Sequence, residues 1–412
     1  MRRDGSAALI VLATVLAAGL SCAPAKQVPP VVEIVFWQFW PVDVVQPLVA
    51  EFERTHPGLE VRVEQLAGQN GQEKILAAVA ADTVPDLCQI GSAWMPGLLA
   101  GGKLADWSAG VADLRESLRG WELCSVGDAL YGVPWTLETR ALFYNKSLFA
   151  RARLDSTRPP ETWDDLYRAA AAIQRLGRGI HGYGVQAGER HELSRKLLPF
   201  LWGNGGHILS DDLRRAEFDS AQNVEALEFY LRLRKVGILE QGDALDREFK
   251  EGRLGLELSG AGLCEQISQD APGLRYGVTL VPKPSADRGS HASWAGGEVL
   301  VSFNASKHKH EALELARFLV RAENALALAA AAESVGPATA GADTGAYYRA
   351  RPQEGMMMRQ FASGHFTPNH PAWGEMEAAL EDEVEQALNG RKTAAEAVRD
   401  AQARLTELVG KR

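Results

Sequence analysis

The sequence predicts an α/β fold of two lobes, each lobe a mostly parallel β-sheet flanked by helices. Three observations support this prediction. Residues 31–91 alternate strand, helix, strand, helix and strand, an order that favours an open sheet with right-handed crossovers. The chain has 412 residues, which is enough for two lobes with separate cores. It contains no Gly/Ser-rich linker, so we expect both lobes to be built from discontinuous segments.

The N-terminus is typical of an exported lipoprotein. Two arginines precede an apolar run over residues 7–20, which is too short to span a membrane. The letters "GLSC" that follow resemble a bacterial lipobox, so we expect residues 1–21 to be a signal peptide and Cys22 to carry lipid. Residues 22–30 are rich in proline and predict an extended tether. The protein would then lie in the periplasm or on the outer face of the cell membrane, held by lipid alone; secretion without lipid is the alternative.

Composition argues against several classes of function. The formal net charge of −9 leaves no basic footprint for nucleic acid, so we expect no such partner. Cys88, Cys124 and Cys264 lie far apart and show no metal-ligand spacing, so we expect buried thiols. Whether two of them form a disulfide stays open. We expect neither a metal nor a cofactor.

The first five elements follow from local composition. Residues 31–40 are apolar and rich in β-branched and aromatic side chains, which is typical of a buried strand. A helix ends near "HPG", residues 59–66 alternate in polarity as a second strand, and residues 85–91 predict a third, buried strand. Ligands of open α/β sheets bind beyond the carboxyl ends of the strands. We therefore predict a binding rim that contains Gln38, Trp40, Gln69, Ser92 and Trp94.

Later segments continue the mixture of strands and helices. Residues 129–149 are typical of two strands that are broken by Pro134. Thr162, with Asp165 three positions later, is typical of a capping box and predicts the start of a helix. Residues 252–262 predict a strand that runs into a glycine-rich turn. Alanine-rich helices follow toward the C-terminus.

Two stretches place tryptophan beside glycines and planar polar side chains. They are "LLPFLWGNGG" (197–206), which holds Trp202 and Asn204, and "SWAGGE" (293–298), which ends in Glu298. An indole can lie against the C–H face of a sugar ring, while amide and carboxylate groups bond its hydroxyls. Glycine lets backbone N–H groups approach a ligand closely. Neither stretch carries a nucleophile or an acid pair, so we expect saccharide recognition without catalysis.

Seven segments in chain order resemble the extracellular solute-binding proteins of ABC importers, of the maltose/trehalose/glycerol-phosphate type. They are "EFERTHPGLEVRVEQ", "ALYGVPWTLETRALFYNKSLF", "PPETWDDL", "LLPFLWGNGGHILSDD", "FDSAQNVEALEFYLRL", "SWAGGEVLV" and "HPAWGEMEAALEDEVEQAL". The resemblance covers residues 32–409, nearly the whole chain after the signal peptide. It implies a monomer with a periplasmic-binding-protein-like fold, in which closure of two lobes captures a sugar or oligosaccharide for delivery to the permease of an ABC transporter.

The resemblance also implies roles for individual residues. Glu138 matches a position where the family often has an acidic, ligand-facing residue at the crossing between the lobes. The segment "SWAGGE" resembles the family's cleft loop, which implies that Trp294 is a platform for the sugar and that Gly296 and Gly297 donate backbone N–H groups. Glu138 and Trp294 should therefore face one cleft that is open to solvent.

Two positions depart from the family pattern. Gly91 stands where sugar binders often carry an aspartate, and residues 364–366 stand where several relatives put an arginine. His365, within the second of these segments, stays among the candidate ligand-binding residues. Because of these departures, the resemblance does not imply a particular sugar.

The division of the chain follows from the resemblance and from the absence of a linker. Lobe I should hold residues 31–137 and 293–328, and lobe II residues 138–292 and 329–412. The expected crossings between the lobes lie near residues 136–142, 284–294 and 326–340.

Other functions stay open. A glycerol phosphodiester, which relatives also carry, would need a cationic or N–H-rich pocket. The predicted binding segments hold few Arg and Lys, so neutral saccharides fit them better. An exported glycoside-active enzyme would need two carboxylates roughly 5–10 Å apart, and no local pair stands in a suitable loop. The sequence also lacks GxSxG and HExxH motifs, so we expect no enzyme; a structural module is the third alternative.

Overall fold

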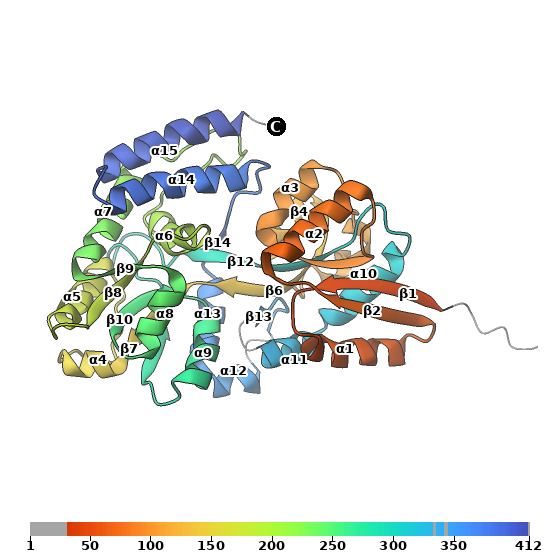
Figure 1. The fold of residues 1–412 in the computed structure, drawn as a ribbon, viewed down its shortest axis with the longest axis horizontal. Helices are drawn as coiled ribbons and strands as arrows, with labels where there is room; N and C mark the ends of the chain where they lie inside the picture. Colours follow the sequence, from red (N-terminus) through yellow and green to blue (C-terminus); the bar gives the residue numbers. More distant parts are fainter. Residues whose placement is uncertain (1–30, 333–334, 342–344, 411–412) are drawn as a thin grey trace, which may run out of the picture.

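The computed structural model describes residues 31–332, 335–341 and 345–410, except for the side chains of residues 68 and 69. It has two lobes, each built on its own sheet, and strands that run from one lobe to the other (Figure 1). This confirms the α/β, two-lobed fold. The signal peptide, the tether and Cys22 lie outside the described residues.

The larger sheet has seven strands in the order β13-β6-β12-β3-β1-β2, with β14 paired to β12. The first three strands of the chain pair in parallel around β1, as the sequence predicts. The strands are β1 (Val32–Gln38), β2 (Leu59–Gln65), β3 (Leu87–Gly91), β6 (Val133–Thr139), β12 (Ser293–Val301), β13 (Gly336–Pro337) and β14 (Gly364–Phe366).

The smaller sheet has five strands in the order β11-β7-β10-β8-β9. Its strands are β7 (Ala141–Asn145), β8 (His181–Gln186), β9 (Gly237–Glu240), β10 (Leu254–Ser259) and β11 (Tyr276–Thr279). A separate ribbon joins β4 (Ser125–Val126) to β5 (Ala129–Leu130).

Helices cover both sheets and bury an apolar core on each side (Figure 1). The larger sheet carries α1 (Val42–Thr55), α2 (Gly68–Ala81), α3 (Met95–Ala100), α10 (Lys309–Leu319) and α11 (Ala322–Ala332). The smaller lobe carries α4 (Lys146–Arg151), α5 (Trp163–Gln174), α6 (Glu192–Gly203), α7 (Ala221–Leu233), α8 (Gly242–Lys250), α9 (Gly262–Asp270), α14 (Trp373–Leu388) and α15 (Ala394–Val409). Between them, α12 (Ala346–Ala350) leads into α13 (Pro352–Phe361), which contacts strands of both sheets.

The chain first passes from the larger sheet to the smaller through a single residue. β6 of the larger sheet ends at Thr139 and β7 of the smaller sheet begins at Ala141, so Arg140 alone separates them. Beside this crossing, β12 brings the chain back and pairs with β6. The Thr139 hydroxyl donates to the Trp294 carbonyl at 2.6 Å, and the Ser293 hydroxyl donates to the Arg140 carbonyl at 2.5 Å. These buried hydrogen bonds hold the two crossing strands together.

The expected mostly parallel pairing needs correction, because both sheets are mixed. β12 runs antiparallel to β3 and β6, and β7 runs antiparallel to β10 and β11. These are the strands that adjoin the crossings. Among the described elements, no helix lies between β6 and β7 or between β11 and β12, so each of these connections lacks the helical crossover that parallel neighbours in one sheet require. The strands that follow them, β7 and β12, therefore run antiparallel to the neighbours named above.

Three further expectations differ from the structure. Pro134 lies inside β6 instead of breaking it. It adjoins a β-bulge of β6, in which Trp135 is the extra residue between the partners of Glu298 and Val299, and its missing N–H is tolerated there. Residues 293–298 begin β12 and are not a loop. Residues beyond 328 are not all in lobe II, since β13 pairs with β6 and β14 with β12 in the larger sheet. β13 covers what would otherwise be an exposed edge of β6.

Other local predictions are confirmed. Thr162 and Asp165 form the predicted capping box at the start of α5. Cys88, Cys124 and Cys264 are buried free thiols, and burial is the main reason why the thiol pKa of each is raised.

Within the described ranges, no helix is both long and apolar enough to span a membrane.

The packing of β12 on β6 predicts a specific sensitivity at Gly297. A Cβ added there would lie 2.0 Å from the Thr136 carbonyl oxygen, which is backbone and cannot rotate away. We expect Gly297→Ala to lower the free energy of unfolding by about 1–3 kcal/mol in urea titrations. Gly374→Ala is the matched control, because a Cβ there meets nothing within 4 Å. Equal stability of Gly297→Ala and wild type would show that the two strands can separate without cost.

Candidate functional site

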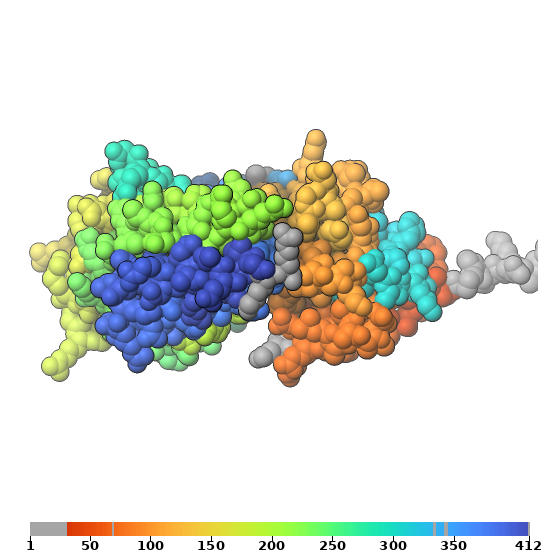
Figure 2. Space-filling view, turned by 90° about the horizontal axis from the view of Figure 1, so that it is seen from above, coloured from red at the N-terminus to blue at the C-terminus, as the bar shows by residue number. Residues whose placement is uncertain are grey.

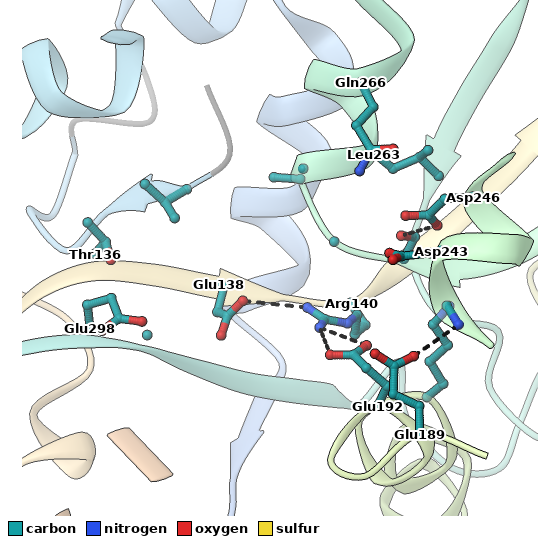
Figure 3. Close-up of a pocket in the computed structure, with 18 of the residues that line it drawn as sticks. Thr136, Glu138, Arg140, Glu189, Glu192, Asp243, Asp246, Leu263, Gln266 and Glu298 are labelled. Atoms are coloured by element: carbon teal, nitrogen blue, oxygen red, sulfur yellow. Dashed lines mark hydrogen bonds and ion pairs between the residues drawn. The ribbon is translucent and has the colours of Figure 1, made fainter. Parts of the chain in front are cut away.

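A cavity of about 390 Å³ lies between the lobes, beside the crossing strands (Figure 3). Seen from above, the lobes form separate masses with a constriction between them (Figure 2). The larger lobe supplies Trp40, Thr136, Glu138, Gly297, Glu298 and Val335 to the cavity wall. The smaller lobe and the crossing supply Arg140, Glu189, Glu192, Lys196, Gly242, Asp243, Asp246, Ser259, Gly260, Ala261, Gly262, Leu263 and Gln266. Among these described residues, Trp40 is the one aromatic side chain.

Arg140 organises the charged floor of this cavity. Its side chain is 7% exposed and lies 3.1 Å from Glu192 of α6 and 3.7 Å from Glu138 of β6. Arg195 pairs with the same Glu192 at 2.7 Å. Burial of Glu192 opposes its ionisation, but the charges of Arg140 and Arg195 win and lower its pKa to about 2. Glu192 is therefore a carboxylate at neutral pH.

Trp294 supports this floor from behind and does not line the cavity. The indole is 4% exposed and belongs to the core of the smaller lobe. The guanidinium carbons of Arg140 and Arg195 lie 5.2 and 4.6 Å from its ring centroid, in cation–π geometry. The expected solvent-facing platform is therefore wrong for Trp294. It shares a face of β12 with Glu298, but it lies at the crossing, where Arg140, Arg195 and the core of the smaller lobe cover its ring.

A second charged group lies deeper in the smaller lobe. Lys196, 3% exposed, is 3.7 Å from the fully buried Glu257, and Ser259 donates to Asp246 at 3.1 Å. Burial raises the pKa of both Asp246 and Glu257, most strongly for Glu257. The Lys196 ammonium opposes that rise in each case. Lys196 is thus buried beside acids of its own lobe.

Glu138 and Glu298 form an acidic pair on the wall of the larger lobe. Glu138 stands opposite Gly296 and Glu298 opposite Thr136, so the two carboxyls occupy the same face of β6 and β12. Both line the cavity. Burial, followed by the charge of Glu138, raises the pKa of Glu298 to about 7. The Thr136 hydroxyl, in a residue 1% exposed, has no hydrogen-bond partner among the described residues.

Four of the residues that the sequence predicts to bind ligand line the cavity: Trp40, Glu138, Gly297 and Glu298. Gly296 does not line the cavity, because the Trp294 ring covers it: an added Cβ would lie 2.3 Å from that ring. The side chain of Gln69 lies outside the described residues.

The remaining nominated residues lie elsewhere. Gln38 is fully buried inside the larger lobe, and Trp94 packs edge-on against Phe39 at 5.7 Å. Ser92 lines a separate, very small pocket beside β14. The Asn204 amide donates to the Gln222 carbonyl at 2.8 Å and to Glu225 at 3.1 Å, which is a structural role.

Trp202 and His365 stack on each other away from the cavity. Their ring centroids are 5.4 Å apart with 20° between the planes. The pair joins the end of α6 to β14, which links the smaller lobe to the larger sheet. Neither residue lines the interlobe cavity.

Sequence reasoning missed the wall that the smaller lobe contributes. Ser259 ends β10 and residues 260–263 follow it, so the rule that ligands bind beyond strand ends could have found them. Glu192 and Lys196 come from the first turns of α6, and nothing in an amphipathic helix marks which polar residues face a cavity. In the described part of the chain, no three His, Cys, Asp or Glu side chains are arranged to hold a metal.

Two known proteins illustrate the range of sequence relatives. A protein of Brucella abortus (strain 2308) described as a binding protein is 28% identical over 278 residues, 65% of this chain and 66% of its own length, which is just under two thirds. The sn-glycerol-3-phosphate-binding periplasmic protein UgpB of Escherichia coli (strain K12) is 27% identical over 206 residues, 48% of this chain and 46% of that protein.

A solved structure matches over nearly the whole chain. It is the cyclic α-maltosyl-1,6-maltose binding protein of Arthrobacter globiformis, with a TM-score of 0.84, 25% identity, and coverage of 93% of this chain and 100% of that one. The family model of the bacterial extracellular solute-binding proteins matches residues 41–326. With this match over more than half of its length, and with a two-lobed fold around a polar interlobe cavity, the chain belongs to the bacterial extracellular solute-binding protein family.

Proposed function

We propose that this protein is the substrate-binding component of an ABC importer, which captures a sugar or oligosaccharide by closing its lobes and delivers it to a membrane permease. The observation that carries the proposal is the interlobe cavity, with Trp40 on one wall and carboxylates, hydroxyls and a glycine-rich turn around it. Sugar hydroxyls both donate and accept hydrogen bonds, and the apolar face of a sugar ring fits an indole. The Arthrobacter globiformis relative, which by its description binds a maltose-type saccharide, supports this class.

Glycerol phosphate is the second candidate, because the partial relative UgpB binds it by name. The cavity speaks against a phosphate ligand, since Arg140 is paired with Glu138 and Glu192. Lys196 is paired with Glu257. A phosphate would compete with these carboxylates for the same cations and would lie beside several further acids.

An exported glycoside-active enzyme is the third candidate, because carboxylates such as Glu138 and Glu298 face the same cavity. The family and the solved relatives are solute-binding proteins, which supports binding without turnover. Incubation with oligosaccharides, followed by chromatography for released sugar, distinguishes the two. Sugar release that depends on Glu138 or Glu298 would contradict the proposal.

The aromatic wall gives the first test of sugar binding. A thermal-shift screen over mono-, di- and trisaccharides should identify ligands, since a solute that binds the folded state raises its melting temperature. Trp40→Ala should then weaken each ligand by about 2–4 kcal/mol in calorimetry, because it removes the aromatic contact surface. Trp202→Ala is the control, since Trp202 does not line the cavity. Equal loss in both variants would count against a platform at Trp40.

We also propose that the protein is a monomer anchored through lipid on Cys22, with residues 1–21 removed. The pattern of charged, apolar and small residues before Cys22 supports this. Mass spectrometry of the native protein should show a lipid-modified N-terminal Cys22, and Cys22→Ala should release the protein from membranes. An unmodified Cys22 in a membrane-bound protein would refute the anchor.

A further inference from the structure

The interlobe cavity carries an excess of acid that neutral saccharides do not require. Its described lining includes two basic side chains, Arg140 and Lys196, against six carboxyl groups: Glu138, Glu189, Glu192, Asp243, Asp246 and Glu298. The figure shows these acids on both walls, around one space (Figure 3). The balance therefore favours a solute that brings positive charge.

The two basic groups are already occupied. Arg140 lies between Glu192 at 3.1 Å and Glu138 at 3.7 Å. Lys196 is 3.7 Å from Glu257, a buried acid outside the cavity lining. Among the described residues, neither Glu298 nor Asp243 has a basic group within 4.0 Å. Glu298 and Asp243 therefore remain available to a solute, whereas the side chains of Arg140 and Lys196 are buried, at 7% and 3% exposed.

One part of the wall has the groups that an ammonium needs. Glu138 and Glu298 lie on the same face of neighbouring strands, and the hydroxyl of Thr136 beside them is buried without a partner. Trp40 also lines this space. An ammonium has three donors, which two carboxylates and a hydroxyl can accept, and an indole face attracts cations.

The electrostatics of Glu298 point the same way. Burial and the nearby charge of Glu138 raise the pKa of Glu298 to about 7, while Gln89 and Arg195 act in the opposite direction. A neutral sugar would leave the two acids facing each other. A bound cation would instead stabilise both carboxylates and drive a proton from Glu298.

The opposing charges in the cavity are smaller. The N-termini of α8 and α9 border it at Gly242 and Gly262, and each brings a partial positive charge of about half a unit. The partial charge of α8 already has a counter-charge, because the Gly242 N–H donates to the Glu189 carboxylate at 3.1 Å. Arg195, which does not line the cavity but pairs with Glu192 at 2.7 Å, offsets one of the four carboxyl groups in excess. Two half-charges do not balance the three that remain.

We infer that the solute is an amino saccharide whose protonated amine lies between Glu138 and Glu298, a conclusion that rests on the proposed sugar-binding function. The sugar ring would pack against Trp40. The amine would leave the contact between Lys196 and Glu257 intact. The remaining carboxyl groups, on α8, on α6 and in the segment just before α6, would accept from hydroxyls of the ring.

Matched saccharides test the charge. Calorimetry at pH 6 would compare glucosamine with glucose, galactosamine with galactose, and the glucosamine β-1,4-disaccharide with cellobiose and with its N-acetylated form. We expect at least one amino member to bind about tenfold or more tightly than its neutral counterparts, the usual scale for a charged hydrogen bond. Neutral members that bind as well as the amino members would overturn the inference and leave the sugar function intact.

Other outcomes separate the inference from the function beneath it. If no saccharide binds, the proposed function fails and the inference falls with it. Binding of spermidine in place of every saccharide would keep the preference for positive charge but remove the sugar, which also overturns the inference.

Proton release provides an independent readout. Calorimetry at pH 6 in two buffers of different ionisation enthalpy counts protons released on binding. Binding of the amino saccharide should release a proton from wild type. It should release none from Glu298→Gln, which keeps the shape of the side chain. Glu60→Gln, at an exposed position on β2, is the control and should behave as wild type. Unchanged proton release in Glu298→Gln would overturn the placement of the amine.

Discussion

The structure depends on one buried cation at the point where the chain first crosses between the lobes. Arg140 separates the last residue of β6 from the first residue of β7, with its side chain 7% exposed. A buried charge is costly unless it is paired, and Arg140 is paired with acids from both lobes, Glu138 and Glu192. It also packs on the indole of Trp294. The crossing, the cavity floor and the contact between lobes are therefore one interaction network.

This network explains why the neighbouring acids differ in protonation. Glu192 lies between two guanidinium groups and is held ionised, with its pKa lowered to about 2. Glu298, which has no such partner among the described residues, has a pKa raised to about 7. The pKa values of these two partly buried carboxyls thus differ because their charged neighbours differ. A set of acids left without cations costs stability in the empty protein, and sites that bind ligands commonly carry such local conflicts.

Sequence reasoning identified the features that depend on local order. Hydrophobic runs located the parallel strands around β1, the Thr162 capping box located α5, and the family resemblance located Glu138 on the cavity wall. It failed where the position of a side chain depends on packing between elements that are distant in the sequence. The letters "SWAGGE" fit a loop platform and a buried strand equally well, and Trp294 is buried because Arg140, Arg195 and the core of the smaller lobe cover its ring. The helix residue Glu192 required the packing of α6, which no local pattern gives.

The division of the acids between lobes has a consequence for closure. Glu138 and Glu298 belong to the larger lobe, while Asp243 and Asp246 belong to α8 of the smaller lobe, and all four line one cavity. Like charges at about 4 Å repel by roughly 1 kcal/mol in water and roughly 4 kcal/mol near a protein surface, so repulsion grows as closure expels water. A solute that places positive charge between the walls turns this repulsion into attraction. Hinge closure would then depend on the charge of the solute as well as on its shape, and the empty cavity would favour separated lobes.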